Sequence, residues 1–136
     1  MRLIDTNIIV RYLTGDDPAK AAACRLLLKR LETGEEQARL CEAHLTEVVY
    51  VLSARAHYGL SHEEIRQRLL PILALKGLKL PRKKLYRRAL DVYVLYPVLD
   101  FEDAVAVAYV EADGLEELYS YDRGFDRVAT VARVEP

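Results

Sequence analysis

The sequence has few of the features that identify disulfide-bonded, membrane-spanning or nucleic-acid-coating proteins. Its only two cysteines, Cys24 and Cys41, match no metal-ligand spacing, and we expect small buried side chains in a reducing compartment. The longest apolar run, residues 104–110, is too short to span a membrane, and an acid stands at position 5, where a signal peptide needs apolar residues. The formal net charge of −1 is unlike that of a strongly basic nucleic-acid coat. We therefore expect a cytoplasmic protein that has no contact with a membrane.

Several common sequence signatures are absent as well. The chain has no internal repeat, low-complexity segment or Gly/Ser linker, and it has no P-loop, G-x-G-x-x-G or G-x-S-x-G motif. Its 136 residues, 51% hydrophobic and 30% charged, have the size and composition of one globular domain. We therefore expect a single domain over residues 1–136.

Short apolar segments alternate with helical patterns along the chain. The strands are expected at residues 2–4, 39–41, 78–80, 118–121 and 130–134. The helices are expected at residues 17–34, 43 to about 57, 61 to about 75, 81 onward, and 100–112. The helix that starts at residue 43 is ambiguous, because its β-branched residues also suit a strand. This alternation predicts an α/β fold with a parallel sheet and helices on both faces.

Four acids fall near the expected carboxyl ends of these strands. Asp5 ends the first strand and Asp122 ends the fourth, while Glu47 lies in the helix that leaves the second strand. Asp103 lies in the first turn of the helix before the fourth strand. Because binding sites in parallel sheets form at this edge, we expect the four carboxylates to converge there. Mg²⁺ and Mn²⁺ prefer such oxygen ligands.

Glu47 provides a separate argument for a cation. It precedes the apolar residues 48–52, so we expect its surroundings to be largely buried. Burying an unpaired carboxylate costs on the order of several kcal/mol. No lysine or arginine lies one helical turn away to pair with it. A metal ion from outside the chain would meet this need.

Structural roles could also explain some of the acids. Asp100 is best explained as a helix N-cap, and Asp103 as an acid favoured by the helix dipole. Asp122 could simply start a turn, and Asp126 is expected at the surface beside Arg123 or Arg127. The joint placement of the acids, more than any one of them, therefore indicates a site.

Two further groups of residues could bind a ligand. His44 and Glu47 have i,i+3 spacing and could bind a transition metal, but no second histidine or cysteine completes the set, so we expect His44 to face solvent. A basic helix carries a stripe of cations that is usually a solvated face, although it could contact RNA phosphates. This stripe consists of Arg82, Lys83, Lys84, Arg87 and Arg88.

The chain resembles a PIN domain, in particular the VapC-type toxins of bacterial and archaeal toxin–antitoxin pairs. Four motifs carry the resemblance and occur in order along almost the whole chain. They are residues 3–7 (LIDTN), 45–49 (LTEVV), 100–104 (DFEDA) and 120–125 (SYDRGF). Each motif is weak alone, but together, at this chain length, they are specific.

The resemblance implies a three-layer α/β/α fold whose five-stranded parallel sheet has the order 3-2-1-4-5. It implies a Mg²⁺- or Mn²⁺-dependent endoribonuclease that forms a homodimer and is inhibited by a cognate antitoxin. A tRNA anticodon loop or a ribosomal RNA stem-loop is the kind of substrate implied. The catalytic and metal-binding residues would be Asp5, Glu47, Asp103 and Asp122. The supporting residues would be Thr6, Asn7 and Ser120, with Asp100 and Asp126 as candidates for an outer metal shell.

Three other functions remain open from the sequence. A housekeeping RNA-processing PIN nuclease would share every motif and differ only in lacking an antitoxin. A phosphatase with Asp5 as nucleophile would usually have a second aspartate where this chain has Asn7. A non-catalytic RNA-binding scaffold would be expected to have lost at least one of the acids, yet all four are present.

Overall fold

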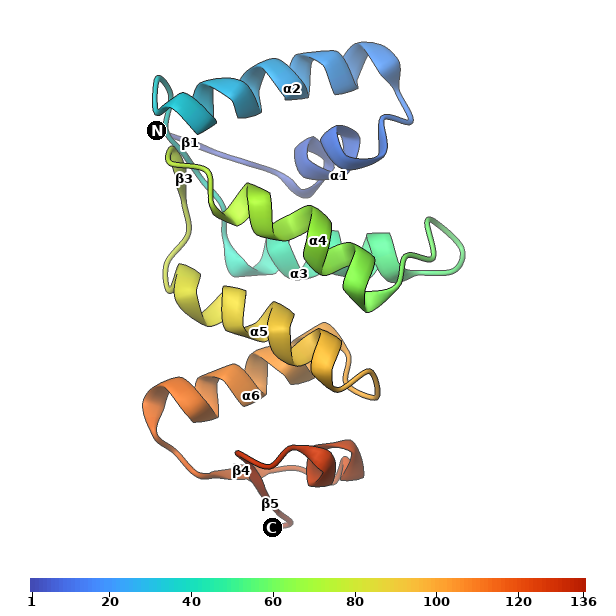
Figure 1. Ribbon diagram of the computed structural model, residues 1–136, viewed down its shortest axis with the longest axis vertical. Helices are drawn as coiled ribbons and strands as arrows, with labels where there is room; N and C mark the ends of the chain where they lie inside the picture. Colours follow the sequence, from blue (N-terminus) through green and yellow to red (C-terminus); the bar gives the residue numbers. More distant parts are fainter. The chain divides into compact units, whose positions relative to one another are not determined.

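The computed structural model describes residues 1–136, which form two compact units, residues 1–83 and 84–136 (Figure 1). The first unit contains β1 (Arg2–Leu3), α1 (Thr6–Thr14), α2 (Pro18–Thr33), β2 (Ala38–Arg39), α3 (Glu42–Ser53), α4 (His62–Leu73) and β3 (Leu78–Lys79). Helix α5 (Lys83–Leu95) begins at the boundary. The second unit continues with α6 (Phe101–Asp113), β4 (Glu117–Tyr119), the 3₁₀ helix η1 (Arg123–Arg127) and β5 (Ala132–Val134). The single domain expected from the sequence stays a prediction.

All the strands pair in parallel, as predicted. In the first unit β1 pairs with β2 and β2 pairs with β3, with Arg2 opposite Ala38 and Ala38 opposite Leu78. In the second unit β4 pairs with β5, with Glu117 opposite Ala132. The parallel α/β architecture is thereby confirmed, with the orders 3-2-1 and 4-5 found in a three-stranded and a two-stranded sheet. The strands are shorter than the sequence predicts.

The predicted helix ends are largely confirmed by their caps. The Asp17 side chain accepts a hydrogen bond from the Lys20 amide at 3.2 Å, and Gly34 ends α2 in the left-handed conformation. The Ser61 hydroxyl accepts from the Glu64 amide at 3.2 Å and caps α4. The ambiguous segment after residue 43 is the helix α3, which ends at Ser53, a few residues earlier than expected.

Helix α1 was not predicted, although the sequence carries its signals. Asp5 is the N-cap of this helix, and Gly15 closes it in the left-handed conformation. Ile9 and Val10 are its buried apolar residues. The helix is short, so its period is easily missed between the strand and the strong start of α2. Its capping residue is nevertheless the first acid of the expected site.

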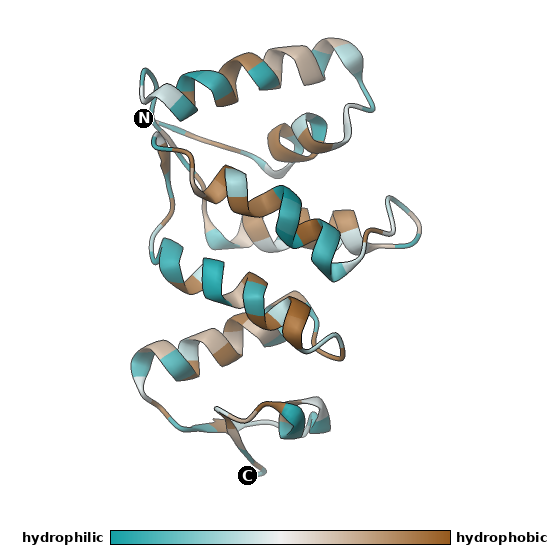
Figure 2. Ribbon diagram, in the orientation of Figure 1, coloured by the Kyte–Doolittle hydropathy of each residue, from teal (hydrophilic) through white to brown (hydrophobic).

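The helices bury apolar faces and expose polar ones. Figure 2 shows hydrophilic and hydrophobic residues in alternating bands along α2, α4 and α5. In the second unit the rings of Tyr93 and Phe101 meet edge to face, with centroids 5.8 Å apart, which ties the start of α6 to α5. The fully buried side chains of the first unit include Ile9, Leu31, Leu45, Leu52, Ile65 and Leu69. None of the helices combines the length and apolar character needed to cross a membrane.

Gly77 allows a close backbone crossing just before β3. Its amide donates to the Leu31 carbonyl at 2.7 Å, and its carbonyl accepts from the Ala38 amide at 2.9 Å. A Cβ at this position would overlap the Glu36 carbonyl oxygen and lie 2.9 Å from the Leu31 carbonyl oxygen. We therefore expect Gly77→Ala to lower the free energy of unfolding by about 3 kcal/mol or more, measured by urea denaturation.

Gly15→Ala is the matched control for this substitution. A Cβ at Gly15 meets no atom within 4 Å, and only the positive φ of +65° opposes it. This strain should cost about 1 kcal/mol. Equal losses in the two variants would show that the crossing at Gly77 does not need a glycine.

Candidate active site

The predicted site residues lie in two groups, one in each unit. Asp5 and Glu47 belong to the first unit, and Asp100, Asp103 and Asp122 to the second. Each group is built by its own helix starts and loops, so each has a local geometry that can be described by itself.

Asp5 lies between the end of β1 and the start of α1. Its Oδ1 accepts a hydrogen bond from the Thr6 amide at 2.8 Å, and its side chain is 67% exposed. Thr6 is buried, and its hydroxyl donates to the His44 carbonyl at 3.4 Å, which links α1 to α3. Asn7 is exposed. The carboxylate of Asp5 is thus held at one oxygen while it remains open to solvent.

The predicted burial of Glu47 is wrong. The buried face of α3 carries Leu45, Val48, Val49 and Leu52, and position 47 points away from that face, so its side chain is exposed. Apolar neighbours in sequence do not surround Glu47, because consecutive residues of a helix face different directions. The cost of burial therefore gives no argument for a cation at Glu47, and its assignment depends on the family motif.

The expectation that His44 faces solvent is also wrong. Its side chain is only 30% exposed, and its Nδ1 lies 3.0 Å from the Ile4 carbonyl oxygen. Its Nε2 lies 3.6 Å from Oδ1 of Asp5. The sequence singled out His44 only as a possible partner of Glu47, and its contacts with Ile4 and Asp5 were not predicted because they join positions far apart in the chain.

The second unit gathers three carboxyl groups at the start of α6. Asp100 is the N-cap of α6, as predicted, and accepts a hydrogen bond from the Asp103 amide at 2.8 Å. Asp103 is partly buried in the first turn of the helix. Burial, together with the negative charges of Asp100 and Asp122, raises the pKa of Asp103 to about 6. The ionised form of Asp103 is therefore disfavoured first by its partial burial and then by the two neighbouring carboxylates.

Asp122 has the turn role that the sequence allowed. Its Oδ1 accepts from the Gly124 amide at 2.8 Å and caps η1. Its own amide donates to the Ser120 hydroxyl at 3.0 Å. Ser120 therefore supports the backbone of Asp122, and the turn leaves the second carboxylate oxygen of Asp122 without a role in the cap.

Asp126 has a stronger partner than the sequence suggested. Nε of Arg133 donates to it at 2.9 Å, and this hydrogen bond holds the pKa of Asp126 below its usual range. Arg133 also donates to the Ser120 carbonyl at 3.1 Å, and its side chain is only 13% exposed. The Arg133 guanidinium already neutralises the Asp126 carboxylate. Asp126 therefore has a structural role that needs no metal ion.

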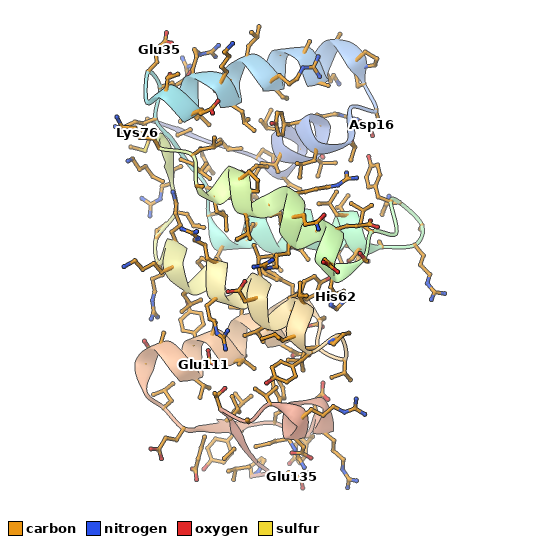
Figure 3. All side chains as sticks on the ribbon, viewed as in Figure 1. Asp16, Glu35, His62, Lys76, Glu111 and Glu135 are labelled. Atoms are coloured by element: carbon orange, nitrogen blue, oxygen red, sulfur yellow. The ribbon has the colours of Figure 1, made fainter.

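The basic residues do not form one stripe on one helix. Arg82 precedes α5 and has a φ of 57°, and the ammonium of Lys83 donates to the Leu78 carbonyl at 2.6 Å. Arg88 is bound to Glu111, which is labelled on α6 in Figure 3, through bonds of 2.8 and 3.2 Å. Lys84 and Arg87 are exposed on α5. The i,i+1 spacing of these residues spreads them over different directions and partners.

The chemistry of the second group fits a hard divalent cation. Asp100, Asp103 and Asp122 supply carboxylate oxygens, the ligands that Mg²⁺ and Mn²⁺ prefer. Burial and the charges of Asp100 and Asp122 both raise the pKa of Asp103, and a bound cation would favour its ionised form. The side chains are not assembled as a finished coordination sphere, since no group of three or more His, Cys, Asp and Glu is placed to hold a metal ion.

The PIN domain family model matches residues 2–131, and the chain belongs to this family. The match supports a nuclease, and PIN domains generally use divalent metal ions. No curated protein matches the chain in sequence. A solved structure similar to it is that of VapBC2 from Rickettsia felis bound to a DNA fragment from their promoter. The identity is 14%, the match covers 98% of this chain and 97% of that chain, and the TM-score is 0.36. A likeness this weak carries no argument about function.

Proposed function

We propose that this PIN domain is a divalent-metal-dependent endoribonuclease and the toxin of a VapC-type toxin–antitoxin pair. The observation that carries the proposal is the match to the PIN domain family over residues 2–131, in a chain that places three carboxyl groups, those of Asp100, Asp103 and Asp122, near the start of α6. Carboxylates placed close together lower the stability of the folded state unless a bound cation offsets their charge. The residues assigned to Mg²⁺ or Mn²⁺ are Asp5, Glu47, Asp103 and Asp122.

The chemistry of phosphodiester hydrolysis explains why a cation is needed. A phosphodiester is an anion, which bare carboxylates would repel. When bound, a divalent ion supplies an activated water and offsets the charge of the transition state. The chain's own groups hold two of the acids in place, because the Thr6 amide fixes one oxygen of Asp5 and the Gly124 amide fixes one oxygen of Asp122. Fixed ligands need little reorganisation when the ion arrives.

The motif resemblance supports the proposed setting of this activity. The four motifs of the VapC-type toxins are present in order, which favours a cytoplasmic homodimer held inactive by a cognate antitoxin. The proposed substrate is a single-stranded loop of tRNA or ribosomal RNA, where unpaired bases are accessible. Lys84 and Arg87 are exposed cations that could meet its phosphates, with Arg82 and Lys83 near them in sequence.

Metal removal tests the proposed reaction. The purified chain is incubated with total tRNA and with ribosomal RNA in Mg²⁺, in Mn²⁺, and in EDTA, and the fragments are separated on denaturing gels. We expect discrete internal cuts with either metal, loss of cleavage in EDTA, and recovery when Mg²⁺ is restored in excess. Full cleavage in EDTA would exclude the metal-dependent mechanism.

A second experiment tests the proposed antitoxin partner. The gene next to this one is inspected for a short DNA-binding protein, which is then expressed together with the chain. We expect a stable complex in which RNA cleavage is suppressed. A nuclease without such a neighbour would instead be a housekeeping RNA-processing enzyme.

A further inference from the structure

His44 is joined to the first acid of the proposed site by two contacts. Its Nδ1 lies 3.0 Å from the Ile4 carbonyl oxygen, and its Nε2 lies 3.6 Å from Oδ1 of Asp5. Ile4 is buried and immediately precedes Asp5, so the ring is fixed against the end of β1. The imidazole therefore has a defined orientation rather than the free rotation of a surface histidine.

The first contact determines which nitrogen carries the proton. A carbonyl oxygen only accepts hydrogen bonds, so Nδ1 must be the donor. In the neutral ring Nε2 then carries a lone pair, and this lone pair faces the carboxylate of Asp5, which also has only lone pairs to offer. Two acceptors that face each other at 3.6 Å are complemented either by a proton on Nε2, which makes an imidazolium–carboxylate pair, or by a metal ion bound to both atoms.

We infer that His44 is a nitrogen ligand to the metal of the proposed nuclease site and that it gives this site a preference for transition-metal ions over Mg²⁺. The inference rests on the proposed function. Metal-binding histidines commonly donate their other ring N–H to a backbone carbonyl, which is the arrangement of His44 and Ile4. Two ligand atoms about 2.1 Å from one ion lie roughly 3.0–3.4 Å apart, close to the separation found here. Imidazole nitrogen suits Co²⁺, Ni²⁺ and Zn²⁺, whereas Mg²⁺ prefers oxygen.

Calorimetric titration with Co²⁺ and with Mg²⁺ tests the inference. The variant His44→Asn keeps a side-chain N–H near the position of Nδ1 and removes Nε2. We expect its Co²⁺ affinity to fall about 10-fold or more, while its Mg²⁺ affinity changes less than about 3-fold. The visible absorption of bound Co²⁺ should change as well. His57→Asn is the control, because His57 is an exposed histidine of the same unit, and it should change neither affinity.

The alternatives give different results. If His44 only positions Asp5, the affinities for both ions fall together, and if His44 pairs with Asp5 as an imidazolium, neither affinity falls. Either result would overturn the inference. RNA cleavage in Mg²⁺ by the unmodified chain, measured in parallel, separates failure of the inference from failure of the proposed function.

A measurement without any variant keeps the test independent of folding. The chain is labelled with ¹⁵N in its histidine rings and titrated with Zn²⁺. We expect the Nε2 resonance of His44 to shift on binding while Nδ1 stays protonated. An Nε2 resonance that does not respond to Zn²⁺ would also overturn the inference.

Discussion

Replacement of Asp5 by asparagine is expected to lower the rate of RNA cleavage by about 10²–10³-fold or more. Asparagine has almost the same shape as aspartate but carries no charge, so it binds a divalent cation far more weakly. The loss corresponds to about 3–4 kcal/mol of transition-state stabilisation. Cleavage by the variant and by the unmodified chain is compared at equal enzyme concentration in Mg²⁺.

The fold should survive this substitution. Asp5 caps α1 through one oxygen, which accepts from the Thr6 amide, and asparagine is as good an N-cap as aspartate. Asp17→Asn is a matched control, because Asp17 caps α2 in the same unit and has no part in the proposed chemistry. We expect both variants to unfold at nearly the same temperature as the unmodified chain, and only Asp5→Asn to lose activity. Unchanged cleavage by Asp5→Asn would contradict the proposed role.

Much of the fold could be predicted from the sequence because the signals were local. Asp17 with Pro18, Ser61 three residues before Glu64, and Gly34 each mark a helix end through contacts within one turn. Helix α1 was not predicted because its apolar periodicity is short and directly follows a strand. The strands were predicted longer because Ile4 and Leu40 are buried apolar residues that follow β1 and β2, and each still donates one hydrogen bond to the neighbouring strand segment, at 2.7 and 2.9 Å.

Less of the site could be predicted, because its details depend on contacts between distant positions. Asp100 and Asp122 act as caps over two or three residues, and both roles were foreseen. The contact between His44 and Asp5 joins α3 to the end of β1, and the contact between Arg133 and Asp126 joins β5 to η1, so neither could be read from local spacing. The predicted burial of Glu47 was wrong for another reason. Its apolar neighbours in the sequence lie on another face of α3 and do not surround its side chain.

The charge concentrated at the start of α6 leads to a prediction in which stability and activity move in opposite directions. In the metal-free protein the folded-state pKa of Asp103 is raised to about 6, above its value of 3.8 in the unfolded chain. The folded state therefore holds the proton more tightly, so stability falls as the pH rises from about 4 to about 6, and the cost stays constant above that range. Asp103→Asn removes this cost.

We expect Asp103→Asn without metal at pH 8 to be more stable than the unmodified chain by about 1–2 kcal/mol, a value reduced for the water that still reaches this partly buried side chain. The melting temperature should rise by roughly 3–7 °C. Addition of Mg²⁺ should reverse the order, because an ion that binds only the folded state stabilises the unmodified chain and not the variant. RNA cleavage by the variant should fall by about 10²-fold or more.

Thermal melting at pH 4 and pH 8, with and without Mg²⁺, measures all of these changes in stability. Glu102→Gln is the matched control, since Glu102 is an exposed acid beside Asp103 in the first turn of α6 and its removal also deletes one negative charge. We expect this control to show neither the gain at pH 8 nor the loss of the Mg²⁺ effect. If both variants melted at the same raised temperature, the cause would be net charge. A gain in Asp103→Asn alone would follow from the burial of the Asp103 carboxylate and its crowding by Asp100 and Asp122, because only that variant removes the charge that both effects disfavour.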